Sequence, residues 1–438
     1  MEKPTAFERF NNWAKNSVTL RLITIAILIL ILLIPSSMIG SLVNERESRR
    51  DEAINEISSK WGRSQTIGGP VLTVPYHPKY RKDLVEYAHF LPEELDIAGN
   101  LNTEMRYCGI YEAVLYNSQL TLKGKFNFPQ FQEWSIPNDD ILWNEATLSL
   151  GITDLLGVKD TISLTWHDKQ LTFEPGLDTK QIFKSGVSIG VPLNKDVGNY
   201  NYEIKLNVNG SQNMMFLPVG KTTTVNLDSP WTAPSFNGDF LPEKRDITED
   251  GFTASWKLLN LNRNYPQSWL NETQKIQKPM FGVELLLPVD EYKKTDRAVK
   301  YSSLFIFLTF LAFFLIETIN KKRIHPIQYL LVGFAITLFY LLLLSLSEYL
   351  RFSYAYLIGS IAILLMVAVY SKSILKKFSL SLLIGLVIAL LYGFFYTLLQ
   401  LQDYSLLLGS IGLFIILAIV MVVTRNINWY GFRAKKEE

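Results

Sequence analysis

The chain has 438 residues, of which 48% are hydrophobic and 19% are charged. Its 43 Lys and Arg residues nearly balance its 41 Asp and Glu residues, which argues against a nucleic-acid partner, because such partners require a concentrated basic surface. The length is sufficient for two domains. The hydrophobic residues are unevenly distributed, since residues 43–300 have the composition of a soluble domain and residues 301–423 that of a membrane bundle.

The N-terminal region is polar over residues 1–21 and apolar over residues 22–42. A positively charged segment followed by an apolar run resembles a signal peptide. The run is too long for a signal core, however, and Pro35 is not followed by a small-x-small cleavage site. We therefore predict an uncleaved transmembrane helix over residues 22–42. Residues 43–62 continue with helix formers and predict a juxtamembrane helix that packs on the next domain through Ala53, Ile54, Ile57 and Trp61.

Residues 69–288 change to the period of β-strands. Alternation of apolar and polar residues is typical of strands with one buried and one solvated face. It is clearest in two runs, which place apolar residues at Leu120, Leu122, Phe126 and Phe128 and at Tyr202, Ile204, Leu206 and Val208. Turn signals separate the strands at Asn209-Gly210, Asn237-Gly238 and Asp250-Gly251. We predict a large, mainly antiparallel, sandwich-like β domain. Its single cysteine, Cys108, excludes an intramolecular disulfide and is expected to be buried.

The C-terminal region contains five apolar blocks separated by short loops. A helix that spans a lipid bilayer needs about 20 mostly apolar residues. The blocks reach this length near residues 301–319, 327–346, 352–370, 378–399 and 404–423. The predicted fold class is therefore a membrane α+β protein, with a β-rich domain over residues 43–300 and six transmembrane helices, one N-terminal and five C-terminal.

Two glutamates lie near the ends of these predicted spans. Glu317 is one turn from Lys321, and Glu348 is close to Arg351. Ionisable residues in a membrane are candidates for function, but these pairs have the position expected of anchors at the membrane interface. Charges are absent from the middle of every predicted span, which weighs against an ion-coupled transporter.

The loop charges predict the orientation of the chain. Cations in short loops stay in the cytoplasm. Alternate loops and the tail over residues 424–438 carry ten of them, namely Lys321, Lys322, Arg323, Lys372, Lys376, Lys377, Arg425, Arg433, Lys435 and Lys436. The opposite loops carry Arg351 alone. We therefore expect the N-terminal segment 1–21 and the tail to be cytoplasmic, and the β domain to lie outside the cytoplasm.

Six separated segments are distinctive. They are GGPVLTVPY (68–76), FLPEEL (90–95), PSFNGDFLPEKRDITEDGFTASW (234–256), TDRAVKY (295–301), HPIQYLLVGFAITLFYLLLLSLSE (325–348) and TRNINWY (424–430). In these segments the chain resembles the CreD family of bacterial inner-membrane proteins. The resemblance implies a multi-pass protein of a Gram-negative inner membrane, with the β domain in the periplasm and a role in envelope integrity or stress tolerance. It supplies no reaction, substrate or catalytic residue.

The segment GDFLPEKR (238–245) contains the first candidate binding or docking residues, Asp239, Phe240 and Arg245. An alternative interpretation is a tight Gly-Asp turn whose aromatic side chain fills the core. Asp296 and Arg297 are the second candidates, because they precede the first C-terminal span within one of the family segments.

Motifs for catalysis or metal binding are absent from the sequence. The four histidines, His77, His89, His167 and His325, lack the spacing of metal ligands, and the chain has no G-x-S-x-G motif. Val219-Gly220-Lys221-Thr222 resembles the end of a phosphate-binding loop, but Met215 stands where that motif requires glycine. We therefore expect no cofactor, no metal and no enzymatic activity.

These observations favour a β domain that binds or senses an envelope protein, lipid or glycan, anchored to the lipid bilayer by the bundle. A first alternative is a transporter or lipid-handling protein, which requires a polar cavity lined by residues such as Thr337, Tyr340, Tyr392 and Tyr396. A second alternative is a membrane-surface enzyme acting on lipid or glycan, which requires a cleft that gathers Asp239, Arg245 and a histidine.

Overall fold

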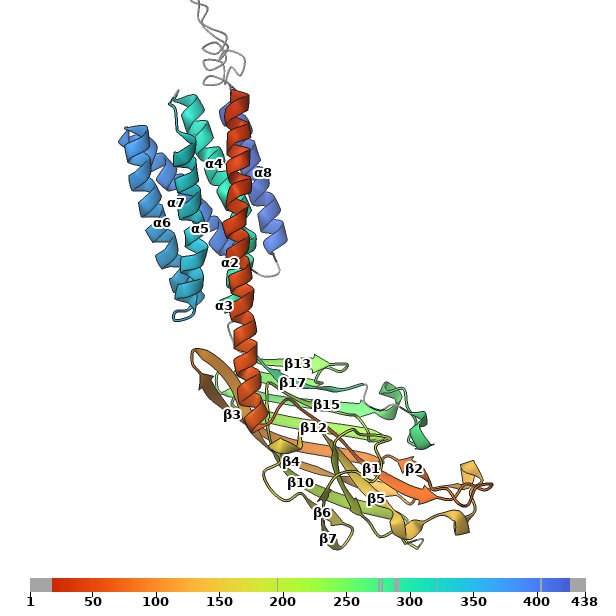
Figure 1. Cartoon of the computed structure of the whole chain (residues 1–438). Coiled ribbons are helices and arrows are strands. Elements are labelled where there is room, and N and C mark those ends of the chain that lie inside the picture. Colours follow the sequence, from red (N-terminus) through yellow and green to blue (C-terminus); the bar gives the residue numbers. More distant parts are fainter. Residues whose placement is uncertain are drawn as a thin grey trace, which may run out of the picture. The chain divides into compact units, whose positions relative to one another are not determined.

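The computed structural model describes residues 18–194, 196–274, 276, 279–286, 291–320, 322–401 and 404–425. The predictions that fall on residues 1–17, Lys321 and 426–438 lie outside this part of the chain. The chain divides into two compact units, Met1–Arg49 with Val289–Glu438, and Arg50–Pro288 (Figure 1).

The unit of residues 50–288 is built from two sheets. Within the described residues the first sheet has nine strands, β1 (Gln65–Tyr76), β2 (Glu86–Phe90), β5 (Thr147–Ile152), β8 (Glu174–Pro175), β9 (Gly186–Gly190), β11 (Asn213–Phe216), β13 (Pro234–Gly238), β16 (Ser268–Leu270) and β17 (Phe281–Leu285). Its main order is β13-β17-β11-β1-β5-β9-β8, and β2 joins β16 to β1.

The second sheet has eight strands in the same part of the chain. They are β3 (Glu94–Cys108), β4 (Tyr111–Asn127), β6 (Ser163–Trp166), β7 (Lys169–Thr172), β10 (Asn199–Ser211), β12 (Thr222–Ser229), β14 (Lys244–Thr248) and β15 (Gly251–Leu259), and their order is β14-β15-β12-β3-β4-β10-β6-β7. The pairs β1–β11 and β3–β12 are parallel and the other pairs are antiparallel.

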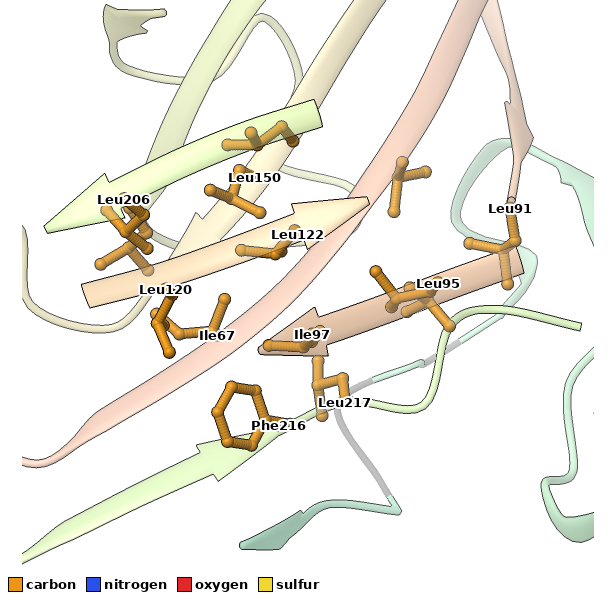
Figure 2. Packing of buried hydrophobic residues seen from close by; sticks show 14 of the residues in the cluster. Ile67, Leu91, Leu95, Ile97, Leu120, Leu122, Leu150, Leu206, Phe216 and Leu217 are labelled. Carbon is orange, nitrogen blue, oxygen red and sulfur yellow. The ribbon is translucent and has the colours of Figure 1, made fainter. Parts of the chain in front are cut away.

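The hydrophobic core of this unit lies between the two sheets. Figure 2 shows Ile67 and Phe216 of the first sheet packed with Ile97, Leu120 and Leu122 of the second, and all five side chains are buried. Along β4 and β10 buried positions alternate with more exposed ones over much of each strand. This alternation is what a half-buried strand requires. The predicted β-rich, mainly antiparallel domain is therefore confirmed.

Two local predictions in this unit are wrong. Asn209 and Gly210 lie inside β10, where Gly210 pairs with Tyr116 of β4, and do not form a turn. A Cβ at Gly210 would come within 2.2 Å of the Tyr116 hydroxyl oxygen, so the glycine is needed to admit the tyrosine ring. Cys108, at the end of the β3–β4 hairpin, is partly exposed, because a hairpin end lies beyond the core.

One histidine is buried in the first sheet. The His89 side chain is fully buried, with its Nδ1 3.0 Å from Thr73 Oγ1 and its Nε2 2.9 Å from Gln181 Oε1. An amide oxygen only accepts hydrogen bonds, so Nε2 carries the proton and the neutral ring is fully satisfied. Burial lowers the pKa of His89 from 6.5 to about 4.

The other unit is a bundle of apolar helices. Six helices among the described residues are long and apolar enough to cross a membrane. They are α2 (Val18–Trp61), α4 (Ser302–Ile319), α5 (Pro326–Ser347), α6 (Phe352–Leu375), α7 (Phe378–Gln400) and α8 (Ser405–Thr424). The predicted arrangement of one N-terminal and five C-terminal helices is confirmed. The short helix α3 (Glu291–Lys300) precedes α4 and buries Thr295, Ala298 and Val299 within this same unit.

Helix α2 combines the predicted first span and the predicted juxtamembrane helix in one helix of 44 residues. Its residues Leu28, Leu32, Ile39 and Val43 are buried in the core of the bundle. Near its C-terminal end, Ile54, Ile57 and Trp61 pack with Ala113 and Leu115 of β4 in the β unit. The helix thus contributes to the hydrophobic packing of both units.

Ion pairs join α2 to the bundle at two positions. Arg21 Nη1 lies 3.3 Å from Glu317 Oε1, and Arg46 Nη1 lies 3.5 Å from Glu348 Oε1. The two arginines are separated by about 37 Å along a helix that rises 1.5 Å per residue, which exceeds the hydrocarbon thickness of a bilayer. Glu348 thus pairs with Arg46 of α2 and not, as predicted, with Arg351. The prediction missed this partner because spacing in the sequence does not reveal neighbours on another helix.

We expect Gly210→Ala to lower the free energy of unfolding by about 2–3 kcal/mol, because Tyr116 is buried and cannot yield to the added methyl group. Gly190→Ala is the matched control, since a methyl group added at this position of β9 would have no atom within 4 Å. Denaturant unfolding of the two purified variants measures the difference. Equal stability of the two variants would contradict this account of β10.

We expect the stability of the β unit to fall between pH 6.5 and pH 4. The unfolded His89 ring binds a proton near pH 6.5, whereas the folded ring resists protonation down to about pH 4. The stabilisation is therefore complete above pH 6.5 and is lost as the pH falls, by about 3 kcal/mol in total. Thermal unfolding across this range measures the slope. His89→Gln should reduce the slope.

Breaking the Arg21–Glu317 pair should destabilise the bundle. Arg21→Gln leaves a carboxylate that is only 4% exposed without this cation, at a cost of about 3 kcal/mol. The double variant Arg21→Gln/Glu317→Gln should recover most of that loss, since no charge is then buried. Arg49→Gln, which breaks an exposed pair with Glu45 on the same helix, should cost at most about 0.5 kcal/mol. Denaturation in detergent micelles compares the variants, and a double variant no more stable than Arg21→Gln would refute the ion-pair explanation.

Candidate functional site

A groove of about 460 Å³ on the β unit brings together aromatic, amide and charged side chains. The three asparagines of its lining lie side by side on neighbouring strands, because Asn102 of β3 and Asn209 of β10 are each directly opposite Asn117 of β4. Trp61, the last residue of α2, and Lys159 complete this part of the lining. The groove therefore combines an indole with a row of amides that can both donate and accept hydrogen bonds.

Hydrogen bonds hold the asparagines in place. Asn117 Nδ2 donates to Asn207 Oδ1 at 2.7 Å and to Asn209 Oδ1 at 2.8 Å. Asn207 Nδ2 in turn donates to Asp160 Oδ2 at 2.6 Å. Asn209 is 1% exposed, and its Nδ2 has no hydrogen-bond partner within the described part of the chain. A buried amide group left unpaired is costly, so a ligand that accepts this hydrogen bond would gain from binding here.

Trp61 is positioned by its own polar atom and by two cations. Its Nε1 donates to the Tyr116 carbonyl oxygen at 3.2 Å, which fixes the plane of the indole. The Lys159 Nζ lies 5.2 Å and the Arg106 guanidinium carbon 5.5 Å from the centre of the indole ring. Arg106 also pairs with Glu104, another residue of the groove lining, at 2.7 Å. Glu104 balances the charge of Arg106, so Lys159 supplies the positive charge beside the aromatic ring.

The predicted residues Asp239 and Phe240 form a structural turn. Gly238 has a φ of 104°, a conformation that favours glycine, and the Asp239 Oδ2 accepts a hydrogen bond from the Met280 backbone at 3.2 Å. Phe240 packs against the core, with its ring 6.2 Å from that of Phe281, and its carbonyl oxygen accepts from Trp256 Nε1 at 3.3 Å. These contacts match the alternative interpretation of this segment, a tight turn whose aromatic side chain fills the core.

Arg245 lies elsewhere in the β unit, on strand β14. It is exposed and lines a hollow of about 470 Å³ together with Lys244, Asp228 and Asp246. The remaining lining comes from β3, β12 and β15 and is small or polar apart from Leu227, and no histidine is present among the described residues that form it. Asp239, Arg245 and a histidine are thus not gathered in this hollow.

Asp296 and Arg297 belong to the bundle unit, on helix α3. Asp296 Oδ2 pairs with Lys300 Nζ at 2.6 Å, one helical turn away. The neighbouring Thr295 is buried, with its Oγ1 3.5 Å from Ser347 Oγ of α5. Arg297 is half-buried on the same helix. The three predicted residues of segment 238–245 and the two of α3 therefore lie in different compact units.

The tyrosines that a transport pathway would need are packed with aromatic rings. Tyr340 and Tyr392 are each 3% exposed, and the space they line with Tyr356 and Phe339 measures about 10 Å³. This is about the smallest volume that holds one water molecule. The Tyr356 hydroxyl donates to the Tyr392 carbonyl oxygen at 2.8 Å, which joins α6 to α7.

In the described residues no cluster of three His, Cys, Asp or Glu side chains could hold a metal ion.

The groove beside Trp61 was not predicted from the sequence. Trp61 was interpreted as packing only, and Asn209 as part of a turn. The asparagines are 15 and 92 residues apart along the chain, so only the register of β3, β4 and β10 brings them together.

Comparison with known proteins shows similarity over nearly the whole chain. Residues 17–430 match the family described as inner membrane protein CreD. The inner membrane protein CreD of Escherichia coli K12 is 36% identical over 424 residues, which cover 93% of each chain. These matches confirm the resemblance found in the separated sequence segments. The chain belongs to the CreD family of inner membrane proteins.

Proposed function

We propose that this protein supports the integrity of the cell envelope as a non-enzymatic binding protein. In this proposal the β unit lies in the periplasm, the groove beside Trp61 binds an envelope glycan, and the helices anchor the chain in the inner membrane. The row of Asn102, Asn117 and Asn209 beside an indole is the observation that carries the proposal.

The chemistry of the groove favours a glycan over a lipid or a protein segment. Sugar hydroxyls both donate and accept hydrogen bonds, as do the amides of Asn117 and Asn209. The apolar face of a sugar ring can pack against the indole of Trp61, while Lys159 favours a ligand that also carries negative charge. An acyl chain would leave these polar groups unpaired, which is unfavourable.

The charges of the loops support a periplasmic β unit. Lys322 and Arg323 follow α4, and Lys372, Lys376 and Lys377 lie near the junction of α6 and α7. The loop between α5 and α6 carries Arg351 as its one cation. Because short cationic loops stay in the cytoplasm, this distribution favours cytoplasmic termini. It also favours a periplasmic position for the β unit, whose strands lie between α2 and α3 in the sequence.

The packing of the bundle favours an anchor over a transporter. Tyr340 and Tyr392, which a polar pathway would expose to water, are buried among aromatic rings. The Tyr396 hydroxyl donates to Ser353 Oγ at 3.0 Å, so this group also serves contact between helices. The described helices thus use their polar groups to pack together, as is common in membranes.

Binding to isolated cell-wall sacculi tests the proposal. We expect the detergent-solubilised full chain to co-sediment with sacculi, and Asn102→Leu to weaken binding about tenfold, because one of the groove's amides is lost. Asn102 is exposed, so this change should leave the fold intact. The binding constant is measured by titrating protein against a fixed amount of sacculi.

Asn226→Leu is the matched control. Asn226 is an exposed strand asparagine of the same sheet, but it lines the hollow around Arg245 instead. Wild-type binding by this variant and weak binding by Asn102→Leu support the groove. Absence of co-sedimentation, or an equal loss in both variants, would refute it.

A further inference from the structure

A second pocket, of about 540 Å³, lies within the bundle unit where α2, α4 and α5 meet. One of its walls is a face of α2 formed by Leu20, Thr24 and Leu28, which follow one another at intervals of four residues. Side chains at this spacing lie above one another on a helix. The wall extends for about 12 Å at 1.5 Å per residue, which is long enough to accompany the upper part of an acyl chain.

The rim of the same pocket is positively charged. Arg21, Arg323 and His325 all line it, and Arg323 and His325 are exposed. His325 Nδ1 accepts a hydrogen bond from the Ile327 backbone at 3.3 Å, so its ring proton is on Nε2, which remains a donor. Arg323 and His325 lie in the loop between α4 and α5, whose cations favour the cytoplasmic side.

One carboxylate, that of Glu317, lies in the pocket with these cations. Its Oε1 is 3.3 Å from Arg21, and its Oε2 accepts a hydrogen bond from the Tyr329 hydroxyl at 2.8 Å. The described lining thus contains two arginines and one carboxylate, so its net charge is positive and attracts an anion.

We propose that this pocket binds an anionic phospholipid. The phosphate lies at the rim beside Arg323 and His325, and an acyl chain packs along Leu20, Thr24 and Leu28. A basic rim above an apolar wall matches the two parts of such a lipid, and basic pockets between membrane helices are suited to anionic head groups. A free phosphate would use the rim alone and would leave the wall unoccupied.

The test uses the full chain in detergent micelles. Phosphatidylglycerol, phosphatidylcholine and inorganic phosphate are added separately, and bound lipid and melting temperature are measured by native mass spectrometry and thermal unfolding. We expect phosphatidylglycerol to bind and to raise the melting temperature, with phosphatidylcholine and inorganic phosphate giving smaller effects. Arg323→Gln should weaken binding of phosphatidylglycerol about fivefold, the effect of one cation near a membrane surface.

Arg351→Gln is the matched control, since Arg351 is exposed and lies at the opposite end of α5. It should bind phosphatidylglycerol like the wild type. Equal binding of the two lipids, or equal behaviour of Arg323→Gln and Arg351→Gln, would overturn the proposal. The lipid comparison needs only the wild-type chain, so it decides the question even if a variant fails to fold.

A further variant separates the lipid from a simple anion. Thr24→Trp fills the apolar wall without altering the charge of the rim. We expect it to reduce phosphatidylglycerol binding at least as much as Arg323→Gln does. Unchanged binding by Thr24→Trp, together with stabilisation by inorganic phosphate equal to that by the lipid, would show an anion site and refute the lipid proposal.

Discussion

The carboxylate of Glu317 determines how three helices meet at one end of the bundle. A buried charge is tolerated only where opposite charge and hydrogen bonds replace the water that it loses. Arg21 of α2 and Tyr329 of α5 provide these partners at 3.3 and 2.8 Å, while Glu317 itself is on α4. Ion pairs and hydrogen bonds depend on the orientation of their groups, whereas apolar packing in lipid does not. The Arg21–Glu317 pair therefore specifies which face of α2 contacts the bundle. It also shapes the pocket that opens beside this pair.

The same rule governs the polar groups of the β unit. His89 is neutral in the core because Thr73 and Gln181 satisfy the neutral ring, and protonation would place an uncompensated charge there. The amides beside Trp61 depart from the rule at one atom, the Nδ2 of Asn209. Other buried polar atoms of the described residues also have no partner, but the Asn209 amide lies on the wall of a groove, where a ligand can supply the missing hydrogen bond.

Local patterns were sufficient to predict the secondary structure and the class of fold. A run of about 20 apolar residues can only be accommodated as a helix in lipid, and alternation of apolar and polar residues over much of a segment identifies strands such as β4 and β10. The register between strands, however, depends on contacts across long stretches of chain. Gly210 illustrates this limit of sequence patterns. Asn-Gly is a strong turn signal, but here the glycine makes room for the side chain of Tyr116, which is 94 residues away in the sequence.

The candidate sites were harder to predict for a related reason. Asp239 and Phe240 are conspicuous in the sequence because a turn needs unusual residues, yet their side chains serve the turn and the core. Trp61 and Arg21 are individually ordinary residues near the two ends of α2, and their neighbours become known only when other elements pack beside them. Sequence patterns thus select residues that are needed for local geometry. They do not reveal residues whose role depends on tertiary neighbours. A helix that contributes to the packing of both units, as α2 does, concentrates residues of the second kind, which is why both pockets proposed as binding sites include side chains from it.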